Sequence, residues 1–365
     1  MDIPIYKPSI DEKESLYVNE ALNSSWISSK GKFIDQFEEE FSKYTGISNS
    51  HSVTNGTVAL HLALLALGIG KNDEVIVPSL TYIASVNCIK YVGAKPVFVD
   101  SELNWQASIS DIEQKITNNT KAIIVVHLYG FAAPIEEIKK IANNNNIFLI
   151  EDCAEAIGTK VKKKHVGNFS DISTFSFYGN KTITTGEGGM VCTNNEFLAK
   201  KIYQLKTQGL AKDKEYWHEI IGYNYRMTNL CAALGLAQIE KVNKFLEKKK
   251  LIFEYYKTKL SNLNITFQDN ICSQNISSYW MICFLLDKDS QRDKLRNYLK
   301  DNGIETRPIF YPIHLMPMYK GARGDFPKSE HIAFKGINLP SYPELTQNEL
   351  DYICSNIISF FDVSK

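Results

Sequence analysis

The chain has 365 residues, 44% of them hydrophobic, and its 41 acidic residues balance its 41 lysines and arginines. This length and apolar content favour a folded protein of two linked domains over a disordered one. The zero net charge and the lack of a basic run exclude the phosphate-neutralising surface that nucleic-acid binding requires. Because no stretch has the pattern of a signal peptide or a membrane span, we expect a cytoplasmic protein with no membrane partner.

The cysteines carry no sign of a metal site. They are scattered and never form a C-x-x-C pair, which indicates reduced, mostly buried thiols instead of a disulfide framework or a zinc site. The seven are Cys88, Cys153, Cys192, Cys231, Cys272, Cys283 and Cys354. No bound metal is expected.

The first predicted ligand site follows a strand that begins near residue 52. Residues 17–23 and the apolar spacing around Phe37 predict two helices before it, joined by a polar connection. Asn55-Gly56-Thr57 then opens a helix over residues 58–67. A helix start directs free backbone N–H groups and its positive dipole end outward, and the Thr57 hydroxyl is a further donor. This pattern predicts a phosphate site at Gly56 and Thr57; the alternative is an ordinary helix cap.

Strands alternate with helices through the next hundred residues. Strands are predicted at 74–78, 96–99, 122–126 and 147–151, with helices at 79–91, 109–116 and 135–142. Such alternation predicts a mostly parallel sheet that binds ligands at the carboxyl ends of its strands. Tyr82 follows one such end, where its ring could stack on a flat ligand or could simply be core.

Asp152 follows the strand over residues 147–150. A carboxylate at the end of a buried strand is costly unless it has a cationic partner, and a protonated pyridine nitrogen is such a partner. The alternative is a helix-capping or structural aspartate. Asp152 is therefore a candidate for holding a ring nitrogen in its charged state.

Lys181 stands in the most distinctive stretch of the chain, residues 171–190. A β-branched and aromatic strand ends at Gly179-Asn180, Lys181 comes next, and a glycine-rich G-E-G-G run precedes a second strand over 190–193. A primary amine in a partly dry pocket has a lowered pKa and can condense with an aldehyde. A solvated surface lysine is the alternative.

The pattern S-F-x-x-x-K-x-x-x-x-G-E-G-G, which includes Ser176 and Lys181, resembles the lysine signature of the DegT/DnrJ/EryC1/StrS family of nucleotide-sugar aminotransferases. The resemblance implies a fold-type I enzyme that uses pyridoxal 5'-phosphate (PLP), with a large α/β domain around a mostly parallel sheet and a smaller α+β C-terminal domain. It implies Lys181 as the catalytic residue that binds PLP covalently. The cofactor contacts it implies are Gly56, Thr57, Tyr82, Asp152, Glu155, Ser176, Lys181 and Asn224.

The segment over residues 215–228 follows a predicted helix at 196–206 and is too polar and aromatic for an ordinary linker. It contains G-Y-N-Y-R-M, and in the family a loop of this form crosses a dimer interface. There its asparagine reaches the phosphate of the neighbouring subunit's cofactor. The resemblance therefore implies a homodimer with shared active sites, in which Asn224 has this role and Arg226 orders the loop.

One helical run is predicted over residues 229–260, apolar first and charged later, which places a domain boundary inside it. We expect a large PLP-binding domain at residues 1–240 and a small domain at residues 241–365. In the small domain a strand is predicted at 279–286 and helices at 291–300 and 347–360.

Residues 303–319 form an irregular stretch whose three prolines fix an extended path. The Arg307 guanidinium matches a carboxylate or a diphosphate, and Tyr311 and His314 are expected substrate contacts. Trp26 joins them because related proteins place this early segment beside the substrate. A proline-stiffened surface turn is the alternative.

Longer runs narrow the resemblance to a subgroup: TYIASVN, IEDCAEA, GNKTITTGEGGM, IGYNYRMTN and RPIFYPIHLMPMY. In that subgroup an amino group passes by ping-pong transamination from L-glutamate to C4 of GDP-4-keto-6-deoxy-D-mannose, and a surface glycan such as an O-antigen lipopolysaccharide receives the sugar. An aminotransferase for a UDP- or dTDP-linked keto sugar is the alternative enzyme. A PLP-dependent sugar dehydratase is disfavoured because it would have histidine in place of Lys181. A noncatalytic binding homologue is the alternative outside enzymes.

Overall fold

The computed structural model describes residues 1–321 and 324–363. Its centre is a seven-stranded sheet in which the four pairings from β8 to β3 are parallel and the two involving β9 are antiparallel. In spatial order the strands are β1 (Asn49–Val53), β9 (Gly189–Thr193), β8 (Ile172–Ser176), β5 (Phe148–Asp152), β4 (Thr120–Val126), β2 (Glu74–Pro78) and β3 (Lys95–Val99). The predicted mostly parallel α/β fold is confirmed.

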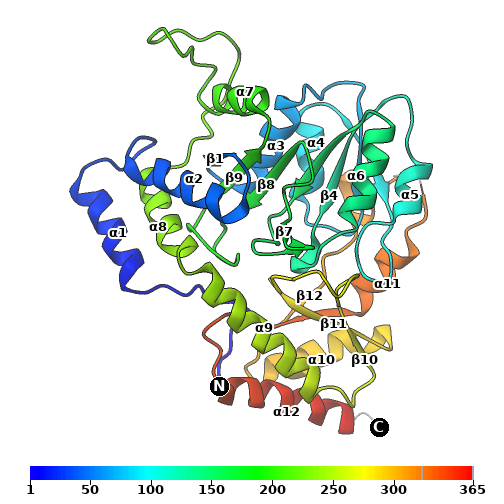
Figure 1. The fold of residues 1–365 in the computed structure, drawn as a ribbon. Helices are drawn as coiled ribbons and strands as arrows, with labels where there is room; N and C mark the ends of the chain where they lie inside the picture. Colours follow the sequence, from blue (N-terminus) through cyan, green and yellow to red (C-terminus); the bar gives the residue numbers. More distant parts are fainter. Residues whose placement is uncertain (322–323, 364–365) are drawn as a thin grey trace.

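Helices cover both faces of this sheet (Figure 1). On β2, Val75 and Val77 belong to one hydrophobic core and Ile76, between them, belongs to the other, as the two-residue period of a strand requires. The first core includes α3 (Gly56–Ala66), α4 (Ala84–Tyr91) and α7 (Glu196–Lys206). The second includes α2 (Lys32–Thr45), α5 (Ile109–Gln114), α6 (Ile135–Asn144) and α8 (Asn229–Ile239), with α1 (Glu12–Asn23) against α8.

A smaller antiparallel sheet forms the C-terminal part, in the order β10 (Ile265–Phe267), β11 (Ile282–Leu286), β13 (Gly336–Leu339) and β12 (Arg307–Pro308). The accompanying helices are α9 (Val242–Lys259), α10 (Asp289–Asp301), α11 (Pro327–Lys335) and α12 (Gln347–Val363). Short elements complete the chain: the hairpin of β6 (Lys160–Val161) and β7 (Lys164–His165), and the 3-10 turns η1 (Leu128–Gly130), η2 (Ile313–Leu315) and η3 (Pro317–Tyr319).

The start of the chain also reaches the smaller sheet region, because Ile3 pairs with Ile304 and the Ile5 N–H donates to Glu305. The α9 helix leads from α8 toward the smaller sheet (Figure 1). The division into a large domain at residues 1–240 and a small domain at residues 241–365 remains a proposal.

Three predicted elements differ in extent. The helix predicted at 79–91 begins only at Ala84, so Tyr82 lies in the loop before it. The run over 229–260 is two helices, because the chain turns at Lys241, whose ammonium pairs with Asp11 and Glu14. The strand predicted from residue 279 begins at Ile282, because Tyr279 has a left-handed backbone with φ of 50°.

No helix among the described residues combines the length and the hydrophobicity that a membrane span needs.

Candidate active site

A cavity of about 630 Å³ opens where the parallel strands of the large sheet end. Its walls come from segments far apart in the sequence, including the ends of β5 and β8 and the start of α3. Seven of the predicted cofactor residues line it: Gly56, Thr57, Tyr82, Asp152, Glu155, Ser176 and Lys181. Side chains chosen from separate motifs thus meet in one space.

The first turn of α3 forms one end of this cavity. Asn55 caps the helix, since its side chain accepts a hydrogen bond from the Val58 N–H at 3.0 Å. The N–H groups of Gly56 and Thr57 point out of the helix at this end. A Cβ on Gly56 would lie 2.8 Å from the Ser176 Cβ, so only glycine lets the helix start lie this close to β8. The positive helix end and the Thr57 hydroxyl fit a phosphate group.

Asp152 ends β5 with its side chain only 4% exposed. The Ser85 hydroxyl donates to it at 2.7 Å and the Ala154 N–H at 3.0 Å, so both hydrogen-bond partners are neutral. Burial raises the pKa of Asp152, and the Ser85 hydrogen bond opposes this shift. A buried carboxylate with neutral partners is stabilised by a cation, and a protonated ring nitrogen would supply one.

Lys181 lies in the turn that follows β8, and its N–H donates to the Tyr178 carbonyl. The Nζ atom lies 3.8 Å from the centre of the Trp280 indole ring. Burial lowers the pKa of Lys181, although the negative charges of Glu155 and Asp152 oppose this. The amine is therefore more often neutral, and hence nucleophilic, than an exposed lysine.

Glu155 is a second buried carboxyl group in the cavity. Its Oε2 accepts a hydrogen bond from the Tyr129 N–H at 2.6 Å. Burial raises its pKa to about 7, and Lys181 limits the rise. Glu155 can therefore gain or lose a proton near neutral pH.

A second cavity, of about 390 Å³, adjoins the first and shares Thr81, Tyr82, Asn180, Trp280 and Phe310 with it. Arg307 and Tyr311 line only this second cavity. The Arg307 side chain is 62% exposed and pairs with Glu305. Two of the predicted substrate contacts, Arg307 and Tyr311, are thus next to the cavity that contains Lys181.

Three predicted site residues line neither cavity. The His314 imidazole lies between the Ser79 hydroxyl, at 2.6 Å, and Glu330, at 3.1 Å. Trp26 is exposed, and Asn224 accepts a hydrogen bond from the Arg226 side chain. Within one chain, these residues do not meet the others.

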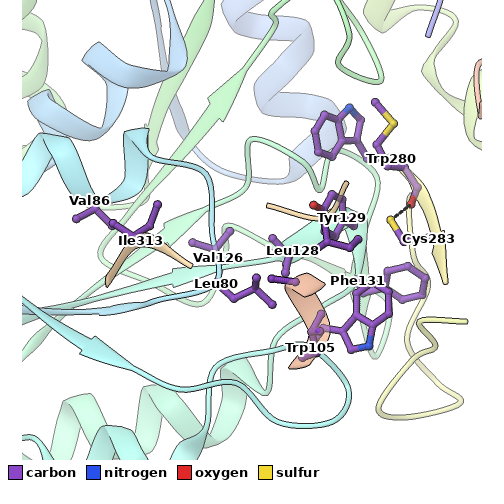
Figure 2. Close-up of a cluster of buried hydrophobic side chains, with 14 of the residues drawn as sticks. Leu80, Val86, Trp105, Val126, Leu128, Tyr129, Phe131, Trp280, Cys283 and Ile313 are labelled. Atoms are coloured by element: carbon purple, nitrogen blue, oxygen red, sulfur yellow. Dashed lines mark hydrogen bonds between the residues drawn. The ribbon is translucent and has the colours of Figure 1, made fainter. Parts of the chain in front are cut away.

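Sequence reasoning missed several cavity residues. Tyr129 stacks on Trp280 with ring centres 5.9 Å apart, and these two rings lie side by side in Figure 2. Phe310 also stacks on Tyr129, with ring centres 5.1 Å apart. No local pattern marks these three aromatics. Ser85 gave no local signal either, because Thr81, whose hydroxyl contacts it at 3.1 Å, lies before the start of the helix at Ala84.

A separate buried cluster contains His127, Glu151 and Cys153. The His127 Nε2 contacts Glu151 at 3.1 Å, and its Nδ1 accepts from the Ala133 N–H. Glu151 also accepts hydrogen bonds from Gly167, Phe169 and Ser170. His127 and Glu151 already have protein partners, and through Glu151 the cluster ties the 167–170 loop to the sheet.

Comparison with known proteins identifies the family of this chain. The sequence profile of the DegT/DnrJ/EryC1/StrS aminotransferase family matches residues 8–358. A GDP-perosamine synthase of Escherichia coli O157:H7 is 55% identical over 361 residues, 98% of each chain, and one of Vibrio cholerae is 47% identical over 99% of each. Among solved structures, the PLP form of Spr1654 from Streptococcus pneumoniae superposes with a TM-score of 0.94 at 28% identity, covering 99% of each chain. The chain belongs to the DegT/DnrJ/EryC1/StrS aminotransferase family.

Proposed function

We propose that this chain is a PLP-dependent aminotransferase that transfers the amino group of L-glutamate to C4 of GDP-4-keto-6-deoxy-D-mannose, giving GDP-perosamine. The observation that carries the proposal is the similarity to proteins named GDP-perosamine synthase, at 43–55% identity across 96% or more of each chain. The meeting of Lys181, Asp152 and the α3 start in one cavity supports the same chemistry.

When bound, PLP supplies an aldehyde that condenses with amines and a protonated ring that accepts electrons as a substrate carbon loses its proton. The residues present fit this group. Gly56, Thr57 and Ser176 would hold its phosphate end and Asp152 its ring nitrogen. Tyr82 would cover a ring face, and Glu155 would lie at the phenolic oxygen.

The Lys181 amine can both bond covalently to the cofactor and carry a proton. Its lowered pKa makes the neutral amine available to hold the cofactor and to take the proton from the carbon beside the substrate nitrogen. The negative neighbours Glu155 and Asp152 stabilise the ammonium once the proton has arrived. Glutamate and the keto sugar use one cavity in turn, so ping-pong kinetics are expected.

We also propose a homodimer in which Asn224 of one subunit reaches the phosphate end of the partner's cavity and Trp26 lies beside the partner's substrate. Neither residue lines the Lys181 cavity or the adjoining cavity of its own chain. The segment between α7 and α8 extends away from the large sheet (Figure 1). It exposes large apolar side chains, which a second subunit would cover: Tyr216, Trp217, Ile220 and Ile221.

The test is the visible absorbance of the purified protein with PLP, followed while glutamate and then GDP-4-keto-6-deoxymannose are added. Loss of the lysine-bound band with glutamate and its return with this sugar, but not with UDP- or dTDP-linked analogues, is expected. Return with an analogue instead would replace the GDP sugar with that substrate. A protein that takes up no PLP would be a noncatalytic homologue.

A second experiment tests Lys181 itself. After borohydride reduction, intact-mass measurement should find the pyridoxyl phosphate adduct in the parent protein and in Lys71→Ala, a control at an exposed lysine. Lys181→Ala should show no adduct and no multiple-turnover transamination. Retained turnover would contradict the assignment.

A further inference from the structure

A second buried lysine, Lys249, lies on α9 behind the wall of the cavity. Its side chain is 0% exposed, and its Nζ donates to the backbone carbonyls of Trp280, at 3.0 Å, and Ser341, at 2.5 Å. Both acceptors are neutral, so no carboxylate balances the charge through these bonds. Burial lowers the pKa of Lys249 to about 7. A methionine would fill a similar volume without the desolvation cost, so the amine needs another explanation.

The explanation begins at two consecutive carbonyls of the Lys181 turn. The Asn180 carbonyl accepts a hydrogen bond from the Trp280 indole N–H at 2.7 Å. The Lys181 carbonyl accepts one from the Tyr6 hydroxyl at 2.6 Å. Two aromatic side chains, from distant parts of the sequence, thus fix the backbone on which the reactive amine stands.

Lys249 contacts both of these aromatic residues. Besides its hydrogen bond to the Trp280 carbonyl, its Nζ lies 5.2 Å from the centre of the Tyr6 ring, within the range of a cation–π interaction. The Trp280 ring in turn lies 3.8 Å from the Lys181 Nζ. One buried lysine side chain therefore joins the two supports of the Lys181 turn.

The segment before β11 needs such an anchor. Tyr279 has a φ of 50°, which costs a non-glycine residue free energy and persists only where the surroundings hold it. Its ring stacks on Phe253 of α9, with centres 4.5 Å apart. Phe253 follows Lys249 by four residues, so one face of α9 holds Tyr279 by its ring and Trp280 by its carbonyl.

We propose that Lys249 is a positioning residue that acts through Trp280 and Tyr6 to fix the location of the Lys181 amine. The inference rests on the proposed function in one respect, namely that Lys181 is the residue that holds the cofactor. It assigns Lys249 no contact with substrate or cofactor.

The test compares Lys249→Met with a matched control, Tyr256→Phe. Tyr256 is also buried on α9, and its hydroxyl donates to the Pro340 carbonyl at 2.9 Å, one residue before Ser341, yet it supports neither carbonyl of the Lys181 turn. For each variant we would measure the thermal unfolding midpoint, the dissociation constant for PLP by absorbance titration, the pH midpoint of the lysine-bound band, and kcat and KM from rates at varied substrate concentrations.

Lys249→Met should shift the pH midpoint of the band and lower kcat about tenfold, the scale expected for a slightly misplaced reactive group, with little change in KM. Tyr256→Phe should change only the unfolding midpoint. Equal effects of the two variants would overturn the proposal, because Lys249 would then only stabilise the fold.

Tyr6→Phe keeps the test available where Lys249→Met fails to fold, because it removes only the hydroxyl that holds the Lys181 carbonyl. Tyr6→Phe should shift the pH midpoint of the band in the same direction as Lys249→Met, and an unchanged pH midpoint would overturn the proposal. A parent protein that forms no band with PLP would remove the proposed function itself, which is a different result from a normal band that the variants leave unchanged.

Discussion

Ser85 donates a hydrogen bond to Asp152, with 2.7 Å between Oγ and Oδ2, at the buried end of β5. The bond favours the ionised carboxylate, in opposition to burial, which raises the Asp152 pKa. Asp152 must be ionised to pair with a protonated ring nitrogen. We therefore predict that Ser85 supports cofactor binding through Asp152.

Ser85→Ala should weaken PLP binding about tenfold, or about 1.4 kcal/mol, the lower range for a hydrogen bond to a charged group. Absorbance titration of the apoprotein measures this. Thr81→Val is the control, since the Thr81 hydroxyl contacts Ser85 at 3.1 Å, whereas the hydrogen bonds to Asp152 come from Ser85 and Ala154. An equal loss in both variants would contradict a role specific to the Asp152 charge.

Glu155 should make the apoprotein less stable as the pH rises. Its pKa is raised from 4.5 to about 7 by burial, so between these values the native state holds a proton that the unfolded state has lost. The free energy of unfolding therefore falls as pH increases through this window. Glu155→Gln removes the titration, and its stability advantage over the parent should grow from pH 5 to pH 8 by on the order of 2 kcal/mol. Urea unfolding at the two pH values measures the difference.

Glu151→Gln provides a contrast of opposite sign. Burial alone would raise the Glu151 pKa, but hydrogen bonds from His127, Gly167 and Ser170 outweigh it and lower the pKa. A depressed carboxyl pKa contributes stability above the unfolded value, and this is lost as pH falls through the folded value. The stability that this variant loses should therefore be nearly the same at pH 5 and pH 8, and it should shrink only as the pH falls below the ordinary value of 4.5. The same trend in both variants would contradict the two assignments.

The sequence predicted the sheet well because its evidence is local. Apolar runs such as 122–126 alternate with amphipathic helices, and that alternation determines a mostly parallel sheet. The break at Lys241 was missed because its cause is distant: the ion pairs run to Asp11 and Glu14. Likewise the short β11 reflects the backbone of Tyr279, which packs on Phe253 of another element.

The residues of the site likewise divide into those with a local sequence signal and those placed by distant contacts. Gly56, Asp152 and Lys181 each stand at a recognisable strand end or helix start, and the structure brings them to one cavity. Trp280 and Phe310 enter that cavity only through tertiary packing, which no local pattern reports. His314 was predicted beside the substrate from its proline-rich neighbourhood, but its ring lies between Ser79 and Glu330. Its role as a substrate contact stays a prediction.

Arg307→Gln should raise the KM for the nucleotide sugar about tenfold or more, the loss expected for a charge-assisted contact, and leave PLP affinity unchanged. Arg307 lines only the second cavity, which a long diphosphate-linked sugar could reach while its keto carbon lies near Lys181. Initial rates with each substrate varied in turn measure this. A raised KM for glutamate alone would instead assign Arg307 to the carboxylate of the amino donor.

Glu305→Gln is the matched control for this change, because it removes the ion-pair partner of Arg307 and keeps the guanidinium. Its KM values should stay within about twofold of the parent, as expected for loss of an exposed pair. A KM increase as large as that of Arg307→Gln would mean that the pair shapes the loop and that the arginine does not itself bind the sugar nucleotide.

Mixed dimers test whether Asn224 serves the neighbouring subunit. Lys181→Ala should be inactive, and Asn224→Ala should bind PLP about tenfold more weakly because a hydrogen bond to a charged phosphate is lost. In a dimer with one subunit of each kind, one site combines an intact Lys181 with the partner's intact Asn224. Such dimers, isolated with two affinity tags, should show tight PLP binding at one site and about half the parent rate.

The control pairs Lys181→Ala with Ser85→Ala, two residues that line the same cavity of one chain. Their mixed dimer has no fully intact site, because the subunit that keeps Lys181 lacks Ser85. It should therefore retain the weak PLP binding of Ser85→Ala. If the Asn224 mixed dimer behaves like this control, Asn224 acts within its own subunit, and the proposed shared site is wrong. If tight PLP binding returns in the mixed dimer with Asn224→Ala but not in the control dimer, the loop between α7 and α8 must complete the partner's cavity.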